Sequence, residues 1–489
     1  MKILIPESTL DIDKKIDMLL DSFRGIVKTF LKDPDPPTWI PPESVTSSNR
    51  KFLNDLQIPS YPNGAPSILF HKLDEHDDKE IEMIFGPGDR QYVIINRALN
   101  TSHSTRISMF ICNTSGSGKT RRMLEGFTKY WGFYFVASPV VKGVGILDFR
   151  IALDDVAQYP EWVSDLELVE DGKRAAQNEL NSRIASKHLR KVLAARVVVF
   201  ELFLQLAIEV HGTLQEKHKL IWLLFQLSDE FIPGYPHPFV RILRCLIGAS
   251  SQAVDTLVQR LDVIRHKYLS QQHFIVGLDQ AEWASRNYPR PFTLSHTLDI
   301  FPSIIGKVVE VFSELPMKLV VSGTVLSLEE FENSTASGVP KDADGVQVFH
   351  ELGMFDTWPK LESFLKRYVP ASILDSSSGS RLQQRMRVYL QGRCVILLFK
   401  QSRLTGGRYL FSVSFVEHLL RNGLQSPHKL LNEFIKGHST CLPDDTGEPF
   451  TLDEPDLQIS VRIRGFEWEA LKYGTSLSFR FLPPRYGVD

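Results

Sequence analysis

The sequence predicts an α/β fold in which a parallel sheet is flanked by helices, and three observations support it. An apolar run at 107–112 is followed by a glycine-rich turn, a helical segment at 119–130 and a second apolar run at 131–137. This order of strand, loop, helix and strand is typical of the start of a parallel sheet. Two later apolar runs, at 273–278 and 317–322, supply further strands.

Other elements follow in order along the chain. Apolar residues recur at helical spacing over 10–32, and the proline-rich stretch that starts at Asp33 ends this helix. A loop or linker is expected at 33–66 and a strand at 92–95. Further helices are expected near 80–84, as two or three segments within 172–228, and at 239–248, 251–270 and 297–314.

These elements divide the 489-residue chain into three regions. We expect a mainly helical and linker region at 1–105, a core at 106–335 with a helical insertion at 172–270, and a C-terminal α+β region at 340–489. The formal net charge of -2 gives the whole chain no bias towards nucleic acid.

The sequence also indicates a compartment. It shows no secretory signal peptide and no apolar stretch of the roughly 20 residues that span a bilayer. Its cysteines lie far apart, which indicates neither a zinc site nor a disulfide framework. We therefore expect an intracellular protein, cytoplasmic or nuclear, without membrane attachment.

The glycine-rich turn carries a phosphate-binding motif. Residues 113–120 fit the Walker A pattern, except that Asn113 stands at the first glycine position. Asparagine tolerates the positive φ that a tight loop requires. Backbone N–H groups and Lys119 would hold phosphate oxygens, and the Thr120 hydroxyl would ligate Mg²⁺. The residues expected to bind the nucleotide are Asn113, Thr114, Ser115, Gly116, Ser117, Gly118, Lys119, Thr120 and Arg121.

The apolar run at 274–278 ends in Asp279, as expected of a Walker B strand. We expect this strand to lie beside the first one, so that Asp279 holds Mg²⁺ through water. In many ATPases a catalytic carboxylate follows this aspartate directly, but here Gln280 follows and Glu282 comes later. Glu282 is the candidate general base, and weak or absent hydrolysis is the alternative.

A third strand end supplies two more candidate catalytic residues, Ser322 and Thr324. A polar side chain at the tip of a strand beside Asp279 could contact the γ-phosphate or position a water molecule. The alternative is ordinary turn chemistry, because Ser-Gly-Thr is a favourable turn sequence.

The motif at 113–121, together with Glu125-Gly, Trp131-Gly-Phe-Tyr-Phe, Asp279-Gln-Ala-Glu and the Val-Ser-Gly-Thr segment, resembles the P-loop ATPase module of fungal Crinkler-type proteins. The resemblance covers roughly 106–330 and, more faintly, 360–425. It implies an additional-strand ATPase fold related to the AAA+ and STAND classes. In that group the module is often joined to another domain, sometimes nuclease-like, but 340–489 shows no nuclease constellation.

A winged-helix pattern is expected near the C-terminus. It comprises a helix at 383–391, strands at 394–399 and 409–413, and a helix that starts at Phe415. Three interpretations of its arginines stay open: a solvated basic face, an arginine that senses nucleotide from a lid, and contact with nucleic acid through 381–408. The arginines are Arg381, Arg385, Arg387, Arg393, Arg403 and Arg408.

Three functions follow as hypotheses. The first is Mg²⁺-dependent binding, with or without hydrolysis, of a nucleoside triphosphate by a nucleotide-dependent switch; ATP is favoured because no guanine-reading motif is found. The second is a non-hydrolysing scaffold or effector, for which a protein partner or self-association stays open. The third is an ATPase module coupled to nucleic-acid binding or processing.

Overall fold

The computed structural model describes residues 12–34, 36–87, 109–113, 116–139, 144–227, 237–293, 303–315, 317–323, 347–349, 355, 357–390 and 409–439. Contacts divide the chain into two compact units, Met1–Gln425 and Ser426–Asp489. Within the second unit the structure describes helix α19 (Pro427–Ser439). All other elements named below belong to the first unit.

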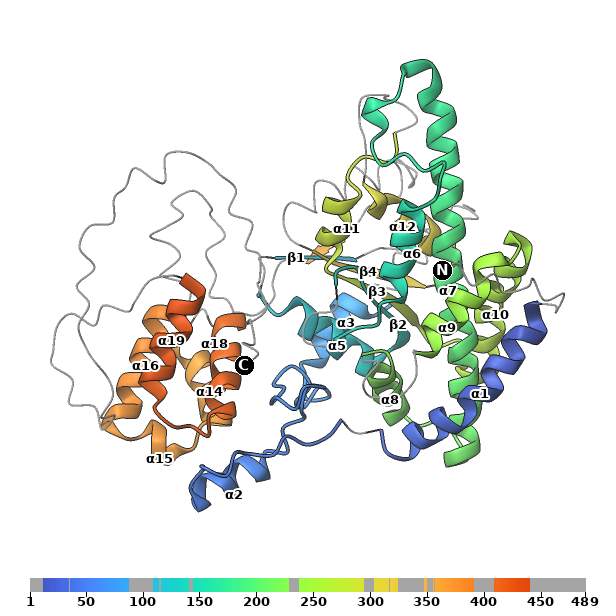
Figure 1. Cartoon of the computed structure of the whole chain (residues 1–489). Coiled ribbons are helices and arrows are strands. Elements are labelled where there is room, and N and C mark those ends of the chain that lie inside the picture. The colour runs from blue at the N-terminus through green and yellow to red at the C-terminus, as the bar shows by residue number, and fades with distance from the viewer. Residues whose placement is uncertain are drawn as a thin grey trace, which may run out of the picture. The chain divides into compact units, whose positions relative to one another are not determined.

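Five parallel strands form the sheet of the described core, in the order β2-β3-β4-β1-β5 (Figure 1). A parallel sheet flanked by helices was expected from the sequence, and the structure confirms it. β1 to β4 are buried along their whole length, which explains why they read as continuous apolar runs. The strands are β1 (Met109–Cys112), β2 (Trp131–Val136), β3 (Phe274–Asp279), β4 (Lys318–Gly323) and β5 (Gln347–Phe349).

The strand order corrects one expectation. β3, which ends in Asp279, pairs with β2 and β4, whereas β1 pairs with β4 and β5. The prediction that the Asp279 strand lies beside the first strand is therefore wrong, because β4 lies between them. Since all strands are parallel, their carboxyl ends still meet at one edge of the sheet, where ligands bind in open α/β folds.

Helices cover both faces of this sheet. On one face α5 (Lys119–Lys129) approaches so closely that a Cβ atom on Gly277 would lie 2.6 Å from Met123 and 2.8 Å from Phe127. On the other face, the rings of Phe133 and Phe135 in β2 pack against aromatic rings of three helices. These helices are α6 (Asp148–Ala157), α7 (Asp171–His211) and α12 (Ile304–Ser313), and the rings are Phe149, Phe200 and Phe312.

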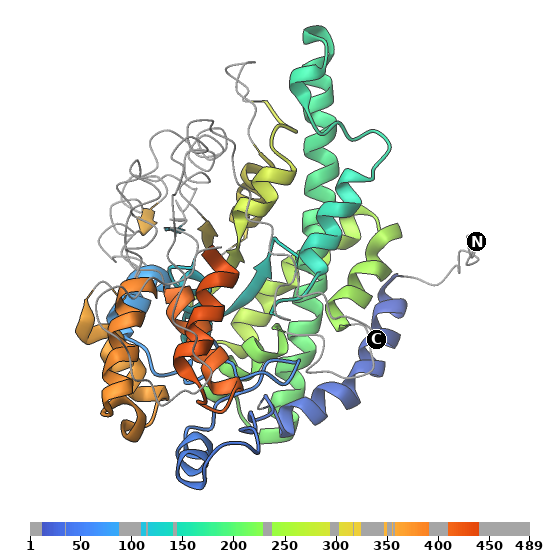
Figure 2. The ribbon, with the colours of Figure 1, turned by 60° about the vertical axis from the view of Figure 1, so that its left-hand side comes forward.

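The helical stretch expected between the second and third strands is present, and α7 alone accounts for 41 of its residues. Figure 2 shows α7 as the longest ribbon, with α1 (Ile12–Lys32) beside it, and Lys28 Nζ donates to Glu209 Oε1 at 2.5 Å. Neither α7 nor any other helix described here has the length and apolar character needed to cross a bilayer. The remaining helices are α2 (Ser47–Asp55), α3 (Asp78–Phe85), α8 (Lys217–Phe225), α9 (Pro238–Cys245), α10 (Ser251–Tyr268) and α11 (Ala281–Asn287).

A buried ion pair supports the edge of the sheet at β2. Arg196 Nε and Nη2 donate to the two carboxylate oxygens of Asp148 at 2.6 and 2.8 Å, and both side chains are fully buried. Arg196 Nη1 also donates to Gln226 Oε1, which in turn accepts from Tyr134 N at 3.0 Å. β2 is an edge strand of the described sheet. The side-chain oxygen of Gln226 therefore accepts the hydrogen bond from Tyr134 N that the carbonyl of a further strand would otherwise accept.

The C-terminal region of the first unit departs from the expected winged helix. Residues 409–413, expected as a strand, belong to helix α18 (Tyr409–Arg421), so that prediction is wrong. The buried positions Ser412, Phe415, Val416 and Leu419 recur at helical spacing, and the alternation Leu-Phe-Ser-Val was too short to distinguish strand from helix. The strands expected at 92–95 and 394–399 lie outside the described residues. The other helices of this region are α14 (Trp358–Tyr368), α15 (Ala371–Leu374) and α16 (Ser377–Leu390).

Candidate functional site

The loop between β1 and α5 has a backbone that requires glycine. Gly116 and Gly118 adopt φ values of 81° and 91°, which L side chains rarely accept. Gly118 is the N-cap of α5, so the first N–H groups of that helix and the positive end of its dipole lie at the loop. Thr114 and Ser115 lie outside the described residues, and their expected contacts stay predictions.

Two buried side chains of this loop, Ser117 and Lys119, carry hydrogen-bond donors that could bind a phosphate. Lys119 Nζ donates to Asn113 O at 2.9 Å, so the ammonium group lies within the loop. The Ser117 hydroxyl is buried and has no hydrogen-bond partner among the described residues. A buried polar group without a partner is uncommon and often marks a ligand position.

The structure brings Thr120 and Asp279 together at the carboxyl edge of the sheet. Thr120 Oγ1 donates to Asp279 Oδ2 at 2.7 Å, across 159 residues of sequence. Because the hydroxyl gives its one proton to the carboxylate, its lone pairs stay available to a cation. A hydroxyl and a carboxylate are hard oxygen donors of the kind that Mg²⁺ prefers, so these residues fit the expected metal.

Asp279 is almost fully buried and is surrounded by donors. Ser322 Oγ, at the end of β4, donates to Oδ1, and Gln280 N donates to the same oxygen at 2.9 Å. Tyr134 Oη, from β2, donates to Oδ2 at 3.1 Å. The expected position of Ser322 beside Asp279 is therefore observed, whereas Thr324 lies outside the described residues.

Glu282 occupies the first turn of α11, close enough to the loop for its charge to interact with that of Lys119. Burial raises the pKa of Glu282, while Lys119 opposes that shift. Its Oε2 atom is buried and has no hydrogen-bond partner among the described residues. Gln280 stands between Asp279 and α11 with a φ of 58°, and its Oε1 accepts a hydrogen bond from Ser138 Oγ, two residues beyond the end of β2.

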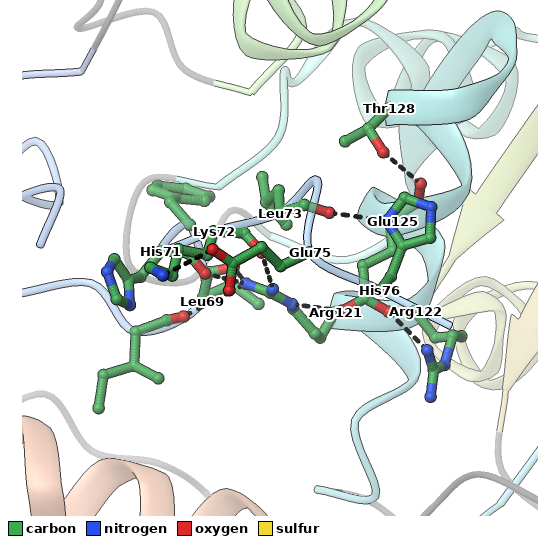
Figure 3. A network of polar contacts seen from close by, with 12 residues as sticks. Leu69, His71, Lys72, Leu73, Glu75, His76, Arg121, Arg122, Glu125 and Thr128 are labelled. Atoms are coloured by element: carbon green, nitrogen blue, oxygen red, sulfur yellow. Dashed lines mark hydrogen bonds and ion pairs between the residues drawn. The ribbon is translucent and has the colours of Figure 1, made fainter. Parts of the chain in front are cut away.

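Arg121 was expected to bind the nucleotide, but the structure gives its guanidinium other partners. Figure 3 shows this group among the carbonyls of the segment that precedes α3. Its nitrogens donate to Leu69 O at 2.7 Å, His71 O at 2.9 Å and Lys72 O at 2.7 Å. Nε donates to Glu125 Oε1 at 2.7 Å. Arg121 therefore fastens this segment to α5.

The same segment, residues 60–73, also contacts the C-terminal helices of the first unit. Glu417 in α18 accepts hydrogen bonds from Ile68 N and Tyr61 Oη, both at 3.1 Å. Tyr368 in α14 contacts His71 Nδ1 at 3.0 Å. The 60–73 segment thus connects the helix that follows the loop to α14 and α18.

Helix α18 also reaches the loop directly. Leu410 N donates to Gly116 O at 2.9 Å, and a Cβ atom on Gly116 would lie 2.6 Å from Leu410 Cβ. No pattern in the sequence indicates this contact, because residues 409–413 were expected to form a strand. Position 116 therefore requires glycine for two reasons: its φ is positive, and Leu410 leaves no room for a side chain.

The arginines of the expected basic stretch do not share one environment. Arg385 is buried, which rules out a fully solvated basic face. Arg387 lies over the ring of Trp358 at 5.9 Å, and Arg381 Nη1 donates to Gln384. The other three arginines of that stretch lie outside the described residues.

Comparisons with protein-family models, curated proteins and solved structures match nothing to this chain. Within the described part of the chain, no cluster of three or more histidine, cysteine, aspartate or glutamate side chains is arranged to hold a metal. The evidence for the candidate site is therefore the arrangement of its own residues.

Proposed function

We propose that this chain binds a nucleoside triphosphate, in the first instance ATP, together with Mg²⁺, and acts as a nucleotide-dependent switch. The observation that carries the proposal is the 2.7 Å hydrogen bond from Thr120 Oγ1 to Asp279 Oδ2. It joins the end of a glycine-rich loop to the end of a buried strand that lies two positions away in the sheet. An ordinary turn before a helix would not be expected to place a hydroxyl against a buried carboxylate at this edge of the sheet.

Each residue of the loop then has a task. The N–H groups at the start of α5 and the Lys119 ammonium neutralise phosphate oxygens. The Ser117 hydroxyl, buried without a partner among the described residues, donates to a phosphate oxygen. Thr120 and Asp279 would hold Mg²⁺, which when bound would neutralise charge on the phosphate oxygens.

Hydrolysis is the second part of the proposal. Glu282 would accept the proton of an attacking water molecule. Burial raises the pKa of its carboxylate towards neutral pH, where a general base works best. Ser322 and Thr324 would help to position that water molecule. The competing function is a scaffold that binds nucleotide without turnover, and it is favoured by Gln280 in the place directly after Asp279.

The resemblance to the Crinkler-type ATPase module remains a proposal, supported by one feature of the fold. An additional-strand ATPase carries an extra strand between the two strands that bear its phosphate and magnesium residues. β4 has this position between β1 and β3. A coupling to nucleic acid through 381–408 is a weaker proposal, since Arg385 is buried.

A pair of variants tests the nucleotide proposal. Thr120→Ser keeps the hydroxyl and Thr120→Val keeps the shape, so calorimetric titration with ATP should show Mg²⁺-enhanced binding for wild type and Thr120→Ser alone. We expect a loss of about tenfold or more for Thr120→Val in Mg²⁺. Equal affinities for the three proteins would reject the site. Steady phosphate release that Glu282→Gln abolishes would distinguish the ATPase from the scaffold.

A further inference from the structure

The carboxylate of Asp279 accepts four hydrogen bonds, two on each oxygen. Thr120 and Tyr134 donate to Oδ2 at 2.7 and 3.1 Å. Ser322 and the backbone of Gln280 donate to Oδ1. An ionised carboxylate has about four lone-pair sites, so each of them is engaged.

Tyr134 is the donor that no motif in the sequence indicates. It lies in the middle of β2, is 1% exposed, and its ring meets Phe127 of α5 edge-on at 5.8 Å. Its backbone N–H is fixed by Gln226, so both the main chain and the ring are held in place.

The two side-chain donors from the sheet flank Asp279 on opposite sides. β3 lies between β2, which carries Tyr134, and β4, which carries Ser322. The terminal torsion of an aspartate is broad, so a carboxylate that is held from one side alone can rotate. Donors from both neighbouring strands fix the plane of this carboxylate and direct one lone pair of Oδ2 at Thr120.

The geometry points to Tyr134 as a positioning residue for magnesium at this site: its hydroxyl holds Asp279 so that Thr120 gives its proton to Oδ2, which would leave the hydroxyl lone pairs free for the cation. Asp279 would then act mainly through Thr120, because direct ligation, or a hydrogen bond from a metal-bound water, would each displace one of its four donors. This inference rests on the proposed nucleotide site and adds a residue to it.

Tyr134→Phe tests the inference, since it removes one hydroxyl and keeps the ring. Tyr130→Phe is the matched control, because Tyr130 also donates to a carboxylate, that of Glu82, but lies at the C-terminal end of α5. Affinity for a fluorescent ATP analogue is measured across a Mg²⁺ titration and again in EDTA. Ser322→Ala provides a second variant that acts on the other oxygen.

We expect Tyr134→Phe to reduce the Mg²⁺-dependent gain in affinity by about tenfold, the effect of one hydrogen bond to a charged group, with the affinity in EDTA unchanged. Ser322→Ala should show the same selectivity, and Tyr130→Phe should match wild type. A Tyr134→Phe protein that retains the full Mg²⁺ effect would overturn the inference, as would an equal loss with and without Mg²⁺. Absence of nucleotide binding by wild type would instead reject the proposed function.

Discussion

The role that the structure assigns to Arg121 can be tested separately from nucleotide binding. Arg121→Ala removes four hydrogen bonds with lengths between 2.7 and 2.9 Å, three of them to backbone carbonyls of the 60–73 segment. Each such bond contributes about 0.5 to 1.5 kcal/mol net. The Arg121 side chain is 25% exposed, which favours the lower half of that range. Of these four bonds, only the three to carbonyls join Arg121 to the segment, so we expect the segment to open more easily by about 1.5 to 3 kcal/mol.

Hydrogen exchange measures this opening directly. Amides of the 60–73 segment should exchange about 10- to 150-fold faster in Arg121→Ala than in wild type. Arg121→Lys should lie between the two, because an ammonium group lacks the planar fork that reaches several carbonyls at once. Arg122→Ala is the control: Arg122 pairs with Glu80 and Glu125, which lie outside the 60–73 segment, so its loss should change exchange within that segment far less. Equal exchange in the Arg121→Ala and Arg122→Ala proteins would refute this account.

Two further predictions concern the core. Gly277→Ala should destabilise the protein by about 1 to 3 kcal/mol in urea denaturation, since its Cβ would lie 2.8 Å from Phe127, whereas Gly25→Ala, with open space around it, should cost nothing. His237 is buried beside Arg196 and its pKa is lowered to about 3, so the folded state favours the neutral ring. Its stabilising contribution is complete above the unfolded pKa of about 6.5 and falls by about 1.4 kcal/mol per pH unit as the pH drops towards 3. His237→Asn, which keeps a side-chain acceptor for Phe239 N, should flatten the dependence of unfolding free energy on pH between 6.5 and 5; an unchanged slope would contradict the assignment.

The sheet was largely predictable from the sequence, and its strand order was not. β1 to β4 are buried on both faces, so each reads as an apolar run of strand length. β5 has three residues, too few for any periodicity to register. The insertion of β4 between β1 and β3 depends on how the connecting helices pack, which no local pattern in the sequence records.

The candidate site was predictable where a residue ends a strand. Asp279 and Ser322 both do so, and the parallel sheet brings them together. Tyr134 was missed because it stands among core aromatics in the middle of a strand. Arg121 was assigned to the nucleotide because it follows Thr120, but neighbouring helix positions differ in direction by about 100°, and its side chain extends towards the 60–73 segment instead.

Calorimetric titration of Mg-ATP into wild type, Lys119→Ala and Arg121→Ala tests whether the loop at 113–120 binds nucleotide phosphates. Lys119 is buried within the loop and Arg121 donates to carbonyls of the 60–73 segment. If the loop binds phosphate, Lys119→Ala lowers the affinity by about 100-fold, and Arg121→Ala changes it by less than about threefold. Wild-type affinity in Lys119→Ala, or a larger loss in Arg121→Ala than in Lys119→Ala, would contradict phosphate binding by the loop.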